Sequence, residues 1–472
     1  MKLPRALFFL GVYFFFSPVR GNSQPGGGLI DTTFHIGSGA SSPVNTINVL
    51  EDGKIIVGGW FDSFNGAPAN LLVRLNEDGT VDQSFTAAKL GWASDDKVLA
   101  ALALPNGKII VGGTFTKANG LGDSGIKMLN SDGSLDQSFQ GNAIGNIRCM
   151  TMQVDGKVLL AGLCSEYSGT STKNIFRINP DGTIDSSFAT MTTGANAGIN
   201  SIALQPDGKI IIGGFFTDYQ GNVANRIARL NTNGSIDYLF DIGTGANDYI
   251  SSNSIAIQSD GKIICGGRFT EYNGVYKNYL MRLNIDGSVD TTFNLGGAGL
   301  NTWASCVFVQ VDDKILIGGT FSEYNSTAAI GLARLKNDGQ LDTSFDAQSS
   351  VGANGQINMM ANQSDNKLLI GGIFTSYQGY PSKHVCRIYG DYSSGVFESK
   401  KIGFSIFPNP SSSSLQIKHS GQEGSVTLFN TMGVIVYAEK LKKEQATINT
   451  SPFPPGLYYV KVGDMVKKLV IE

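Results

Sequence analysis

Four acidic residues recur at matching places along the chain, each directly before a tyrosine, and they are the first candidates for chemistry. They are Glu166, Asp218, Glu271 and Glu323. Carboxylates act as general acids or bases when their geometry and pKa values are tuned for it, and no spacing in the sequence indicates such a pair. We expect solvated surface groups; the alternative is an extracellular enzyme that acts on polysaccharide through these carboxylates.

Other catalytic and metal-binding motifs are absent from the sequence. The three histidines, His35, His384 and His419, show no metal-ligand spacing, and there is no G-x-S-x-G motif or phosphate-binding loop. Asn76 and Asp78 match part of a calcium loop, but the closing bidentate Glu is missing. We predict no catalytic residue, no metal and no cofactor.

Aromatic residues are better candidates for a binding site. Trp92, Trp303 and Tyr249 are not repeated in a chain that otherwise repeats, and aromatic faces suit sugar rings and flat apolar surfaces. A packing role is the alternative for each. A second aromatic set recurs from copy to copy, which favours loop packing: Phe64, Tyr167, Tyr219, Tyr272, Tyr324 and Tyr377.

A repeat must position these residues, and residues 202–217 (IALQPDGKIIIGGFFT) show it best. Pro206, Asp207 and Gly208 predict a three-residue hairpin loop. The apolar run after Lys209 predicts a strand buried on both faces. The second glycine of the stretch recurs at steps of 49 to 54 residues: Gly59, Gly113, Gly162, Gly214, Gly267, Gly319 and Gly372. Seven copies at a near-constant step indicate a repeat architecture.

The residue pattern of each copy predicts four short antiparallel strands, named A to D. In the fourth copy they are 200–205, 209–216, 226–231 and 235–240. Seven such units fit a β-propeller. The first D strand, 29–34, precedes any A strand, and the seventh copy, which ends near Tyr389, lacks its own. We predict that the N-terminal strand completes the last blade, closes the ring and places Asp31 opposite Arg387.

An arginine of strand C recurs eight residues before an aspartate of strand D, which places opposite charges across from each other. Because most copies share this pair, we expect it to stabilise the blades rather than to bind a ligand. The pairs are Arg74–Asp82, Arg177–Asp185, Arg229–Asp237, Arg282–Asp290 and Arg334–Asp342.

The loops of a propeller sort onto two faces. The A–B and C–D turns are short and alike, whereas the D–A and B–C loops on the opposite face vary, and variable loops on a rigid scaffold usually carry function. Trp92, Trp303 and Tyr249 lie in the loops before strand A. The expected function is therefore a binding or adhesion module for an extracellular glycan or protein.

Composition narrows the class of protein. The chain of 472 residues carries 36 Lys and Arg against 39 Asp and Glu, so no nucleic-acid-binding surface is indicated. Lys2, Arg5 and the apolar run 6–16 predict a signal peptide over 1–23, and we expect no transmembrane segment in the mature form. The cysteines replace apolar or small residues of other copies, which predicts buried thiols: Cys149, Cys164, Cys265, Cys306 and Cys386.

The motif L-x-x-D-G-K-I-x-V-G-G-x-F-T-x-[YF]-N-G, followed by R-[IL]-x-x-D-G-[ST]-[LVI]-D-x-[ST]-F, resembles the delta-60 repeat family. The resemblance covers about 29–389 and implies a secreted bacterial seven-bladed propeller without a settled activity. Copies two and three depart from the motif, with Met128 for the arginine and Ala161 and Cys164 for Gly and Phe. The predicted fold class is all-β, with a seven-bladed β-propeller at 24–392 and a linker at 393–396.

The tail, 397–472, has a different pattern of short alternating strands, which predicts a small C-terminal β-sandwich. Its motifs F-P-N-P, L-F-N-T-M-G, P-G-L-Y-Y-V-K-V and K-K-L-V-I resemble the C-terminal sorting domain of the type IX (Por) secretion system. The resemblance implies export across a Bacteroidota outer membrane by the type IX machinery, followed by removal of the tail and release or surface attachment. We expect the tail to fold independently, with its last strand as the sorting signal: Lys467, Lys468, Leu469, Val470 and Ile471.

Overall fold

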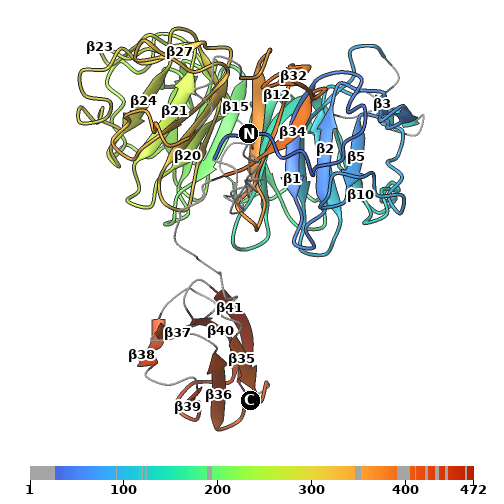
Figure 1. Cartoon of the computed structure of the whole chain (residues 1–472). Helices are drawn as coiled ribbons and strands as arrows, with labels where there is room; N and C mark the ends of the chain where they lie inside the picture. The colour runs from blue at the N-terminus through green and yellow to red at the C-terminus, as the bar shows by residue number, and fades with distance from the viewer. Residues whose placement is uncertain are drawn as a thin grey trace, which may run out of the picture. The chain divides into compact units, whose positions relative to one another are not determined.

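The computed structural model describes thirteen stretches of the chain: 27–91, 93–115, 117–118, 121–122, 125–188, 194–345, 352–390, 404–409, 411–419, 424–430, 435–441, 445–462 and 465–471. Within these residues every regular element is a β-strand, and no helix occurs (Figure 1). The chain divides into two compact units, Met1–Tyr392 and Ser393–Glu472.

The first unit is the predicted seven-bladed propeller, and each blade is an antiparallel sheet in the order A–B–C. The A strands are β1 (Val44–Val49), β6 (Val98–Ala103), β11 (Ala143–Met152), β15 (Ile199–Leu204), β20 (Ile250–Ile257), β25 (Ala304–Val309) and β30 (Ile357–Asn362). The B strands are β2 (Ile55–Gly59), β7 (Ile109–Gly113), β12 (Val158–Tyr167), β16 (Ile210–Gly214), β21 (Ile263–Gly267), β26 (Ile315–Gly319) and β31 (Leu368–Gly372). The C strands are β5 (Leu72–Leu75), β10 (Ile126–Leu129), β14 (Ile175–Ile178), β19 (Ile227–Leu230), β24 (Leu280–Leu283), β29 (Leu332–Leu335) and β34 (Val385–Ile388).

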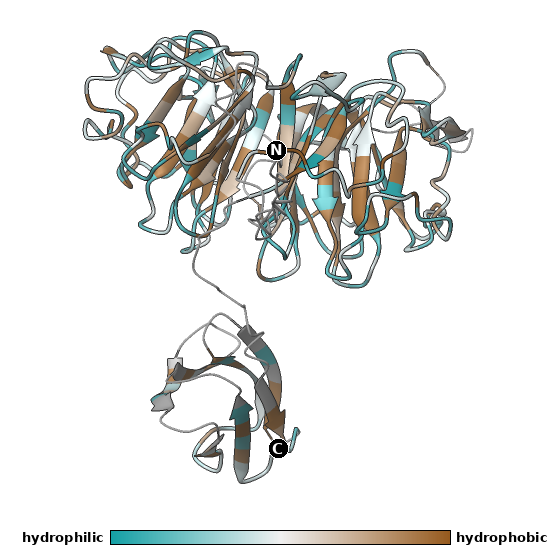
Figure 2. Ribbon diagram, viewed as in Figure 1, coloured by the Kyte–Doolittle hydropathy of each residue, from teal (hydrophilic) through white to brown (hydrophobic). Residues whose placement is uncertain are grey.

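The middle strand of each blade is apolar because neighbouring blades cover both of its faces. All five residues of β16 are buried, as predicted, and Figure 2 shows the apolar colour gathered on such strands. A Cβ on Gly213 would lie 2.7 Å from Ile255 of the next blade, and a Cβ on Gly214 would overlap the carbonyl oxygen of Gly198. The two glycines therefore let the adjacent blade and the adjacent strand approach closely, as predicted.

The ring closes as predicted. Each A strand contacts the A strand of the next blade, and β30 contacts β1. Ile30 forms an antiparallel bridge with Ile388 of the last blade, and the Asp31 amide donates to the Arg387 carbonyl at 2.8 Å. The Arg387 Nε also donates to Asp31 Oδ2 at 2.8 Å. The N-terminal segment thus supplies the edge that the seventh copy lacks, and closure protects that edge.

The predicted D strands, such as 235–240 in the fourth copy, are much shorter in the structure than predicted. Each is a single antiparallel bridge, such as Leu230↔Ile236. The D-x-[ST]-F segment that follows is a turn, because the aspartate accepts from nearby backbone and hydroxyl groups: Asp82 Oδ1 accepts from the Ser84 amide at 3.0 Å and the Ser84 hydroxyl at 2.7 Å. Such local bonds compete with strand pairing.

Small hairpins that were not predicted occupy the B–C loops. They are β3–β4 (Ser63–Phe64, Ala67–Pro68), β8–β9 (Lys117–Ala118, Leu121–Gly122), β17–β18 (Asp218–Tyr219, Asn222–Val223), β22–β23 (Glu271–Tyr272, Val275–Tyr276), β27–β28 (Glu323–Tyr324, Thr327–Ala328) and β32–β33 (Ser376–Tyr377, Tyr380–Pro381), while β13 (Thr170–Ser171) pairs with β12. The recurring tyrosines lie here and pack as predicted: Tyr219 is buried, and its hydroxyl donates to the Gly234 carbonyl at 2.8 Å.

The predicted Arg–Asp pairs form, and each has a third member that the sequence analysis missed. Arg229 Nε lies 2.7 Å from Asp237 Oδ2, and Lys209 Nζ lies 2.9 Å from the same oxygen. The guanidinium also stacks on Phe240 and donates to the Ile285 carbonyl in the C–D turn of the next blade. These clusters join neighbouring blades, which is the structural role expected of a repeated pair.

The second unit is a sandwich of two antiparallel sheets, as predicted. One sheet has the order β35 (Phe404–Phe407), β36 (Ser414–His419), β39 (Gln445–Asn449), and the other has the order β38 (Ile435–Leu441), β37 (Gly424–Asn430), β40 (Gly456–Val462), β41 (Met465–Ile471). Leu415, Val460 and Leu469 are among the buried residues between the sheets. β35 and β39 were not predicted from the sequence.

Candidate functional site

A cavity of about 370 Å³ lies where the seven A strands begin, next to the D–A loops. Its size falls within the usual range for small-molecule pockets. Trp303 and Tyr249, two of the three residues predicted to bind a ligand, line it. Trp92, the third, lies outside the described residues. The structure therefore brings the two placed candidates together on the predicted face.

One position of each A strand supplies most of the cavity wall. In every blade the pairing of strands A and B shifts register at a bulge. The bulge directly follows the first paired residue of strand A, except in β11, where it follows Ile147. The side chain at the bulge faces the cavity. A β-bulge re-aims side chains in this way. The seven residues are Asn45, Leu99, Arg148, Asn200, Ser251, Ser305 and Asn358.

Asparagines at this position also connect adjacent blades. The side-chain nitrogen of Asn45 donates to the Val98 carbonyl at 3.2 Å, and that of Asn200 donates to the Ile250 carbonyl at 2.9 Å. Asn358 makes the equivalent bond to the Val44 carbonyl across the closure of the ring. The asparagines are therefore part of the scaffold, and the positions without asparagine give the cavity its particular chemistry.

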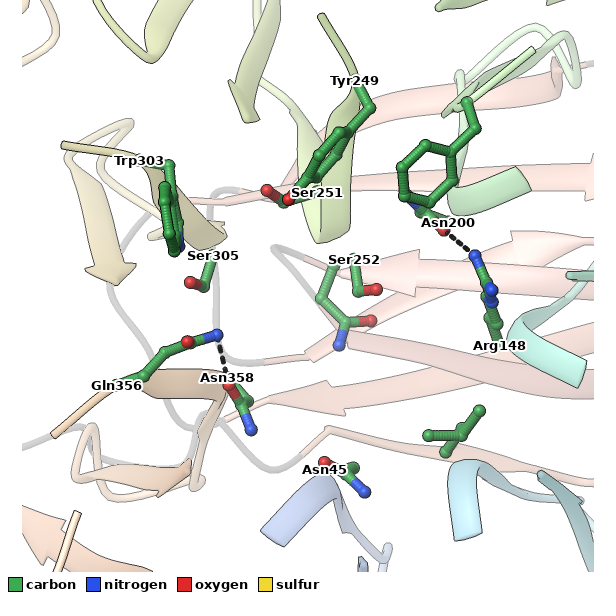
Figure 3. A pocket seen from close by; sticks show the side chains of 13 residues that line it. Asn45, Arg148, Asn200, Tyr249, Ser251, Ser252, Trp303, Ser305, Gln356 and Asn358 are labelled. Atoms are coloured by element: carbon green, nitrogen blue, oxygen red, sulfur yellow. Dashed lines mark hydrogen bonds between the residues drawn. The ribbon is translucent and has the colours of Figure 1, made fainter. Parts of the chain in front are cut away.

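The fifth blade departs most from the repeat. Ile250 and Ile255 pair with Gly267 and Cys265, which lie two residues apart on strand B. In the first blade the equivalent partners on strand A, Val44 and Ile47, are three residues apart rather than five. The two additional residues push Ser252 and Asn253 into the cavity. Figure 3 shows Ser252 between the side chains of the surrounding blades.

The aromatic wall is built from loops just outside the A strands. Tyr249 stacks on Phe215 with ring centroids 4.5 Å apart. Trp303 lies under the guanidinium of Arg268, 5.2 Å from its ring centroid. Both aromatic residues are half-buried, so part of each ring is available to a ligand.

Arg148 is the one charged side chain among the described residues that line the cavity. Its Nη1 donates to Asn200 Oδ1 at 2.7 Å, and its guanidinium lies 5.7 Å from the ring centroid of Phe215. Burial lowers the pKa of Arg148. Arg148 was not among the predicted site residues; its one signal in the sequence is a charge where other copies have Asn, Ser or Leu.

The recurring acidic residues that carried the enzyme alternative are placed elsewhere. Glu166 Oε1 accepts from the Gly169 amide and Asp218 Oδ1 from the Gly221 amide, so both cap hairpin turns. Glu271 and Glu323 are exposed. Neither these four nor any other described Asp or Glu lines the cavity.

A second cavity, of about 510 Å³, lies farther along the A strands. Most of its lining residues are apolar, and Cys149 and Cys306 line it at equivalent positions of two blades. Burial raises the pKa of each thiol to about 12, so both are protonated at neutral pH. All five cysteines are free and buried, as predicted.

Metal sites are not evident in the described part of the chain, where no group of three or more His, Cys, Asp or Glu is placed to hold an ion. The partial calcium motif is explained by its turn: Asp78 Oδ1 accepts from the Thr80 amide at 3.0 Å and the Thr80 hydroxyl at 2.7 Å.

Comparison with protein families places these features in context. A model described as a domain of unknown function (DUF5122) β-propeller matches seven stretches, about half of the chain: 50–85, 104–139, 153–188, 205–240, 258–293, 310–345 and 363–389. The chain belongs to this β-propeller family. Each match in this DUF5122 propeller begins at an A–B turn, and the first six end at the phenylalanine after the D bridge. The predicted repeat is confirmed.

The tail of this DUF5122 protein matches a secretion system C-terminal sorting domain over 405–472. This sorting domain indicates export by the type IX secretion system to the cell surface or beyond. Within the described residues no helix is long and apolar enough to cross a membrane. A comparison with curated proteins finds no match.

Solved structures resemble the chain only in fold. PorZ, a surface component of the type IX secretion system of Porphyromonas gingivalis, is 13% identical with a TM-score of 0.40, over 92% of this chain and 60% of PorZ. A fungal alcohol oxidase of the AA5 family in complex with copper is 12% identical with a TM-score of 0.46, over 92% of this chain and 98% of the oxidase. This chain thus spans about 60% of the length of PorZ.

Proposed function

We propose that this exported propeller is a binding module that captures an extracellular glycan in the cavity at the start of its A strands. The observation that carries the proposal is the convergence of Trp303 and Tyr249 on one cavity whose other lining residues are mostly amides and hydroxyls. Aromatic faces suit the apolar faces of sugar rings, and amide and hydroxyl groups supply both donors and acceptors for sugar hydroxyls.

The tail serves export in this proposal. The tail comprises 397–472 and carries the sorting signal in its last strand. It follows a propeller at 24–392 and a linker at 393–396, and a signal peptide over 1–23 is removed first. Support comes from the alternation along β41: Leu469 and Ile471 are buried in the sandwich, whereas Lys467 is exposed. β41 is also the last strand in the order of its sheet. Asn409 and Ser411 bond to its end at Val470 and Ile471, so a receptor would approach it on the side of Lys467.

A glycan array probed with residues 24–472 tests the binding proposal. We expect at least one glycan class to bind, and we expect Trp303→Ala and Tyr249→Ala each to weaken that binding about tenfold or more, as central aromatic contacts do. Trp92→Ala is measured beside them, since Trp92 remains a predicted ligand contact.

Two exposed aromatic residues outside the cavity lining provide matched controls. Trp60 is 42% exposed and Tyr238 is 75% exposed, and we expect Trp60→Ala and Tyr238→Ala to leave the affinity within about twofold. Equal losses in all variants, or unchanged affinity after removal of Trp303 and Tyr249, would contradict the placement of the site.

A further inference from the structure

Arg148 differs from the other arginines at the core of the blades because it has no acidic partner among the described residues. Arg229 and Arg282, for example, each lie within 2.8 Å of an aspartate oxygen. Arg148 makes a hydrogen bond to the neutral amide of Asn200 instead. A half-buried positive charge without a counter-charge is costly, and this one stands in the wall of a cavity.

The guanidinium is held in place and keeps donors to spare. It has five N–H groups in a rigid fork, and Asn200 accepts one of them while Phe215 packs on the guanidinium. Fixed forks of this kind bind carboxylates through two parallel hydrogen bonds. The wall is therefore prepared for one negative charge.

A second polar group of the wall also needs a partner. The hydroxyl of Ser305 is buried, since the residue is 5% exposed, and it has no hydrogen-bond partner among the described residues. Buried hydroxyls are almost always hydrogen-bonded. In Figure 3 Ser305 and Arg148 lie on different sides of the cavity, with Ser252 between them.

We propose that the cavity binds an acidic saccharide, a glycan that carries a uronate residue. Its carboxylate lies on the guanidinium of Arg148, its ring lies against Tyr249 or Trp303, and its hydroxyls bond the Ser305 hydroxyl and the amides of the wall. Because no Asp or Glu is among the described lining residues, the ligand supplies the counter-charge of Arg148. This inference rests on the proposed glycan binding and adds the charge of the ligand to it.

The test compares uronate-containing oligosaccharides with carboxyl-reduced forms of the same oligosaccharides, which keep the sugar rings and lose the charge. Oligosaccharides of glucuronate, galacturonate and mannuronate, and their reduced forms, are titrated calorimetrically into residues 24–472 at low and moderate salt. We expect one acidic series to bind about tenfold or more tightly than its neutral form, the range of a charge-assisted contact. The preference should shrink as salt rises.

Variants assign the preference to its residue. Arg148→Gln should remove most of the preference for the acidic form, and Arg148→Lys should restore part of it, because lysine keeps the charge and loses the fork. Lys336→Gln removes an equal charge from an exposed C–D turn and should leave the preference intact. The melting temperature of each variant confirms that it is folded.

The outcomes separate this inference from the proposal beneath it. Equal binding of acidic and neutral forms that depends on Trp303 would overturn the uronate inference and leave glycan binding in place. A preference that survives Arg148→Gln would overturn the role of Arg148. If no saccharide binds, both the uronate inference and the glycan-binding proposal are overturned. This holds whether or not the protein binds an acidic peptide or free succinate at the same concentrations.

Discussion

Replacing Asp31 with asparagine tests how the ring closes. The Asp31 side chain is fully buried and faces two cations, Arg387 Nε at 2.8 Å and Lys367 Nζ at 3.3 Å. Asn keeps the oxygen that accepts from the Thr33 amide at 3.0 Å, and it replaces the charged oxygen that faces the two cations with an uncharged amide nitrogen, which cannot accept their hydrogen bonds. Removing one partner of a buried ion pair usually costs about 3–5 kcal/mol, and we expect that loss in the free energy of unfolding.

The second blade offers the matched control. Met128 replaces the arginine there, so Asp136 pairs with Lys108 alone, at 2.7 Å, and the lysine side chain is 34% exposed. Partly exposed pairs contribute about 1 kcal/mol or less, so Asp136→Asn should cost far less than Asp31→Asn.

Urea unfolding followed by tryptophan fluorescence measures both losses, because the chain's three tryptophans, Trp60, Trp92 and Trp303, all belong to the first unit. The fluorescence transition therefore reports on the propeller without interference from the tail. Equal losses for Asp31→Asn and Asp136→Asn would refute the argument that the N-terminal segment locks the ring through a buried charge. Deletion of 29–34 should be more damaging still, since it also opens a sheet edge.

Three further predictions follow from the scaffold. Burial alone would raise the pKa of the cluster aspartates, such as Asp31 and Asp185, but hydrogen bonds and neighbouring cations outweigh it and hold the pKa below the usual range. The contribution of these aspartates to folding stability is therefore complete above about pH 5 and is lost as the pH falls toward their folded pKa values. The melting temperature should be level from pH 8 to about 5 and fall below about pH 4. A melting temperature that does not fall in acid would contradict this. Gly214→Ala should destabilise the propeller by more than about 2 kcal/mol in urea, because the new Cβ would overlap the backbone at Gly198, and a loss below about 1 kcal/mol would show that the strands can separate easily. Removal of 397–472 should leave a folded propeller in the periplasm, as cell fractionation and limited proteolysis would show; normal amounts at the cell surface would contradict the sorting role, and an unfolded product would contradict independent folding.

Much of the scaffold could be predicted because it repeats. The glycine step indicated seven blades, the D-G-K turn and the apolar run located strand B, and the eight-residue spacing paired Arg229 with Asp237. The missing D strand of the last copy led directly to the contact between Asp31 and Arg387. Each of these features follows from a local residue pattern or from a pattern that recurs in several copies of the repeat.

The cavity could be predicted only in part. Its face and two of its aromatic residues followed from the variable loops, but Arg148, Ser305 and Asn358 face the cavity because of a register shift between strands A and B. A register shift depends on the packing of adjacent blades rather than on a residue type, so the sequence does not mark it. The D strands were overestimated because the side chain of an aspartate such as Asp82 bonds its own turn.

The most direct test of the central claim is a crystal structure of the mature protein with the glycan that the array selects. We expect the saccharide in the cavity at the start of the A strands, in contact with Trp303 or Tyr249 and with Arg148. Density for the saccharide on the A–B and C–D turns, or on the outer hairpins such as β17–β18, would contradict it.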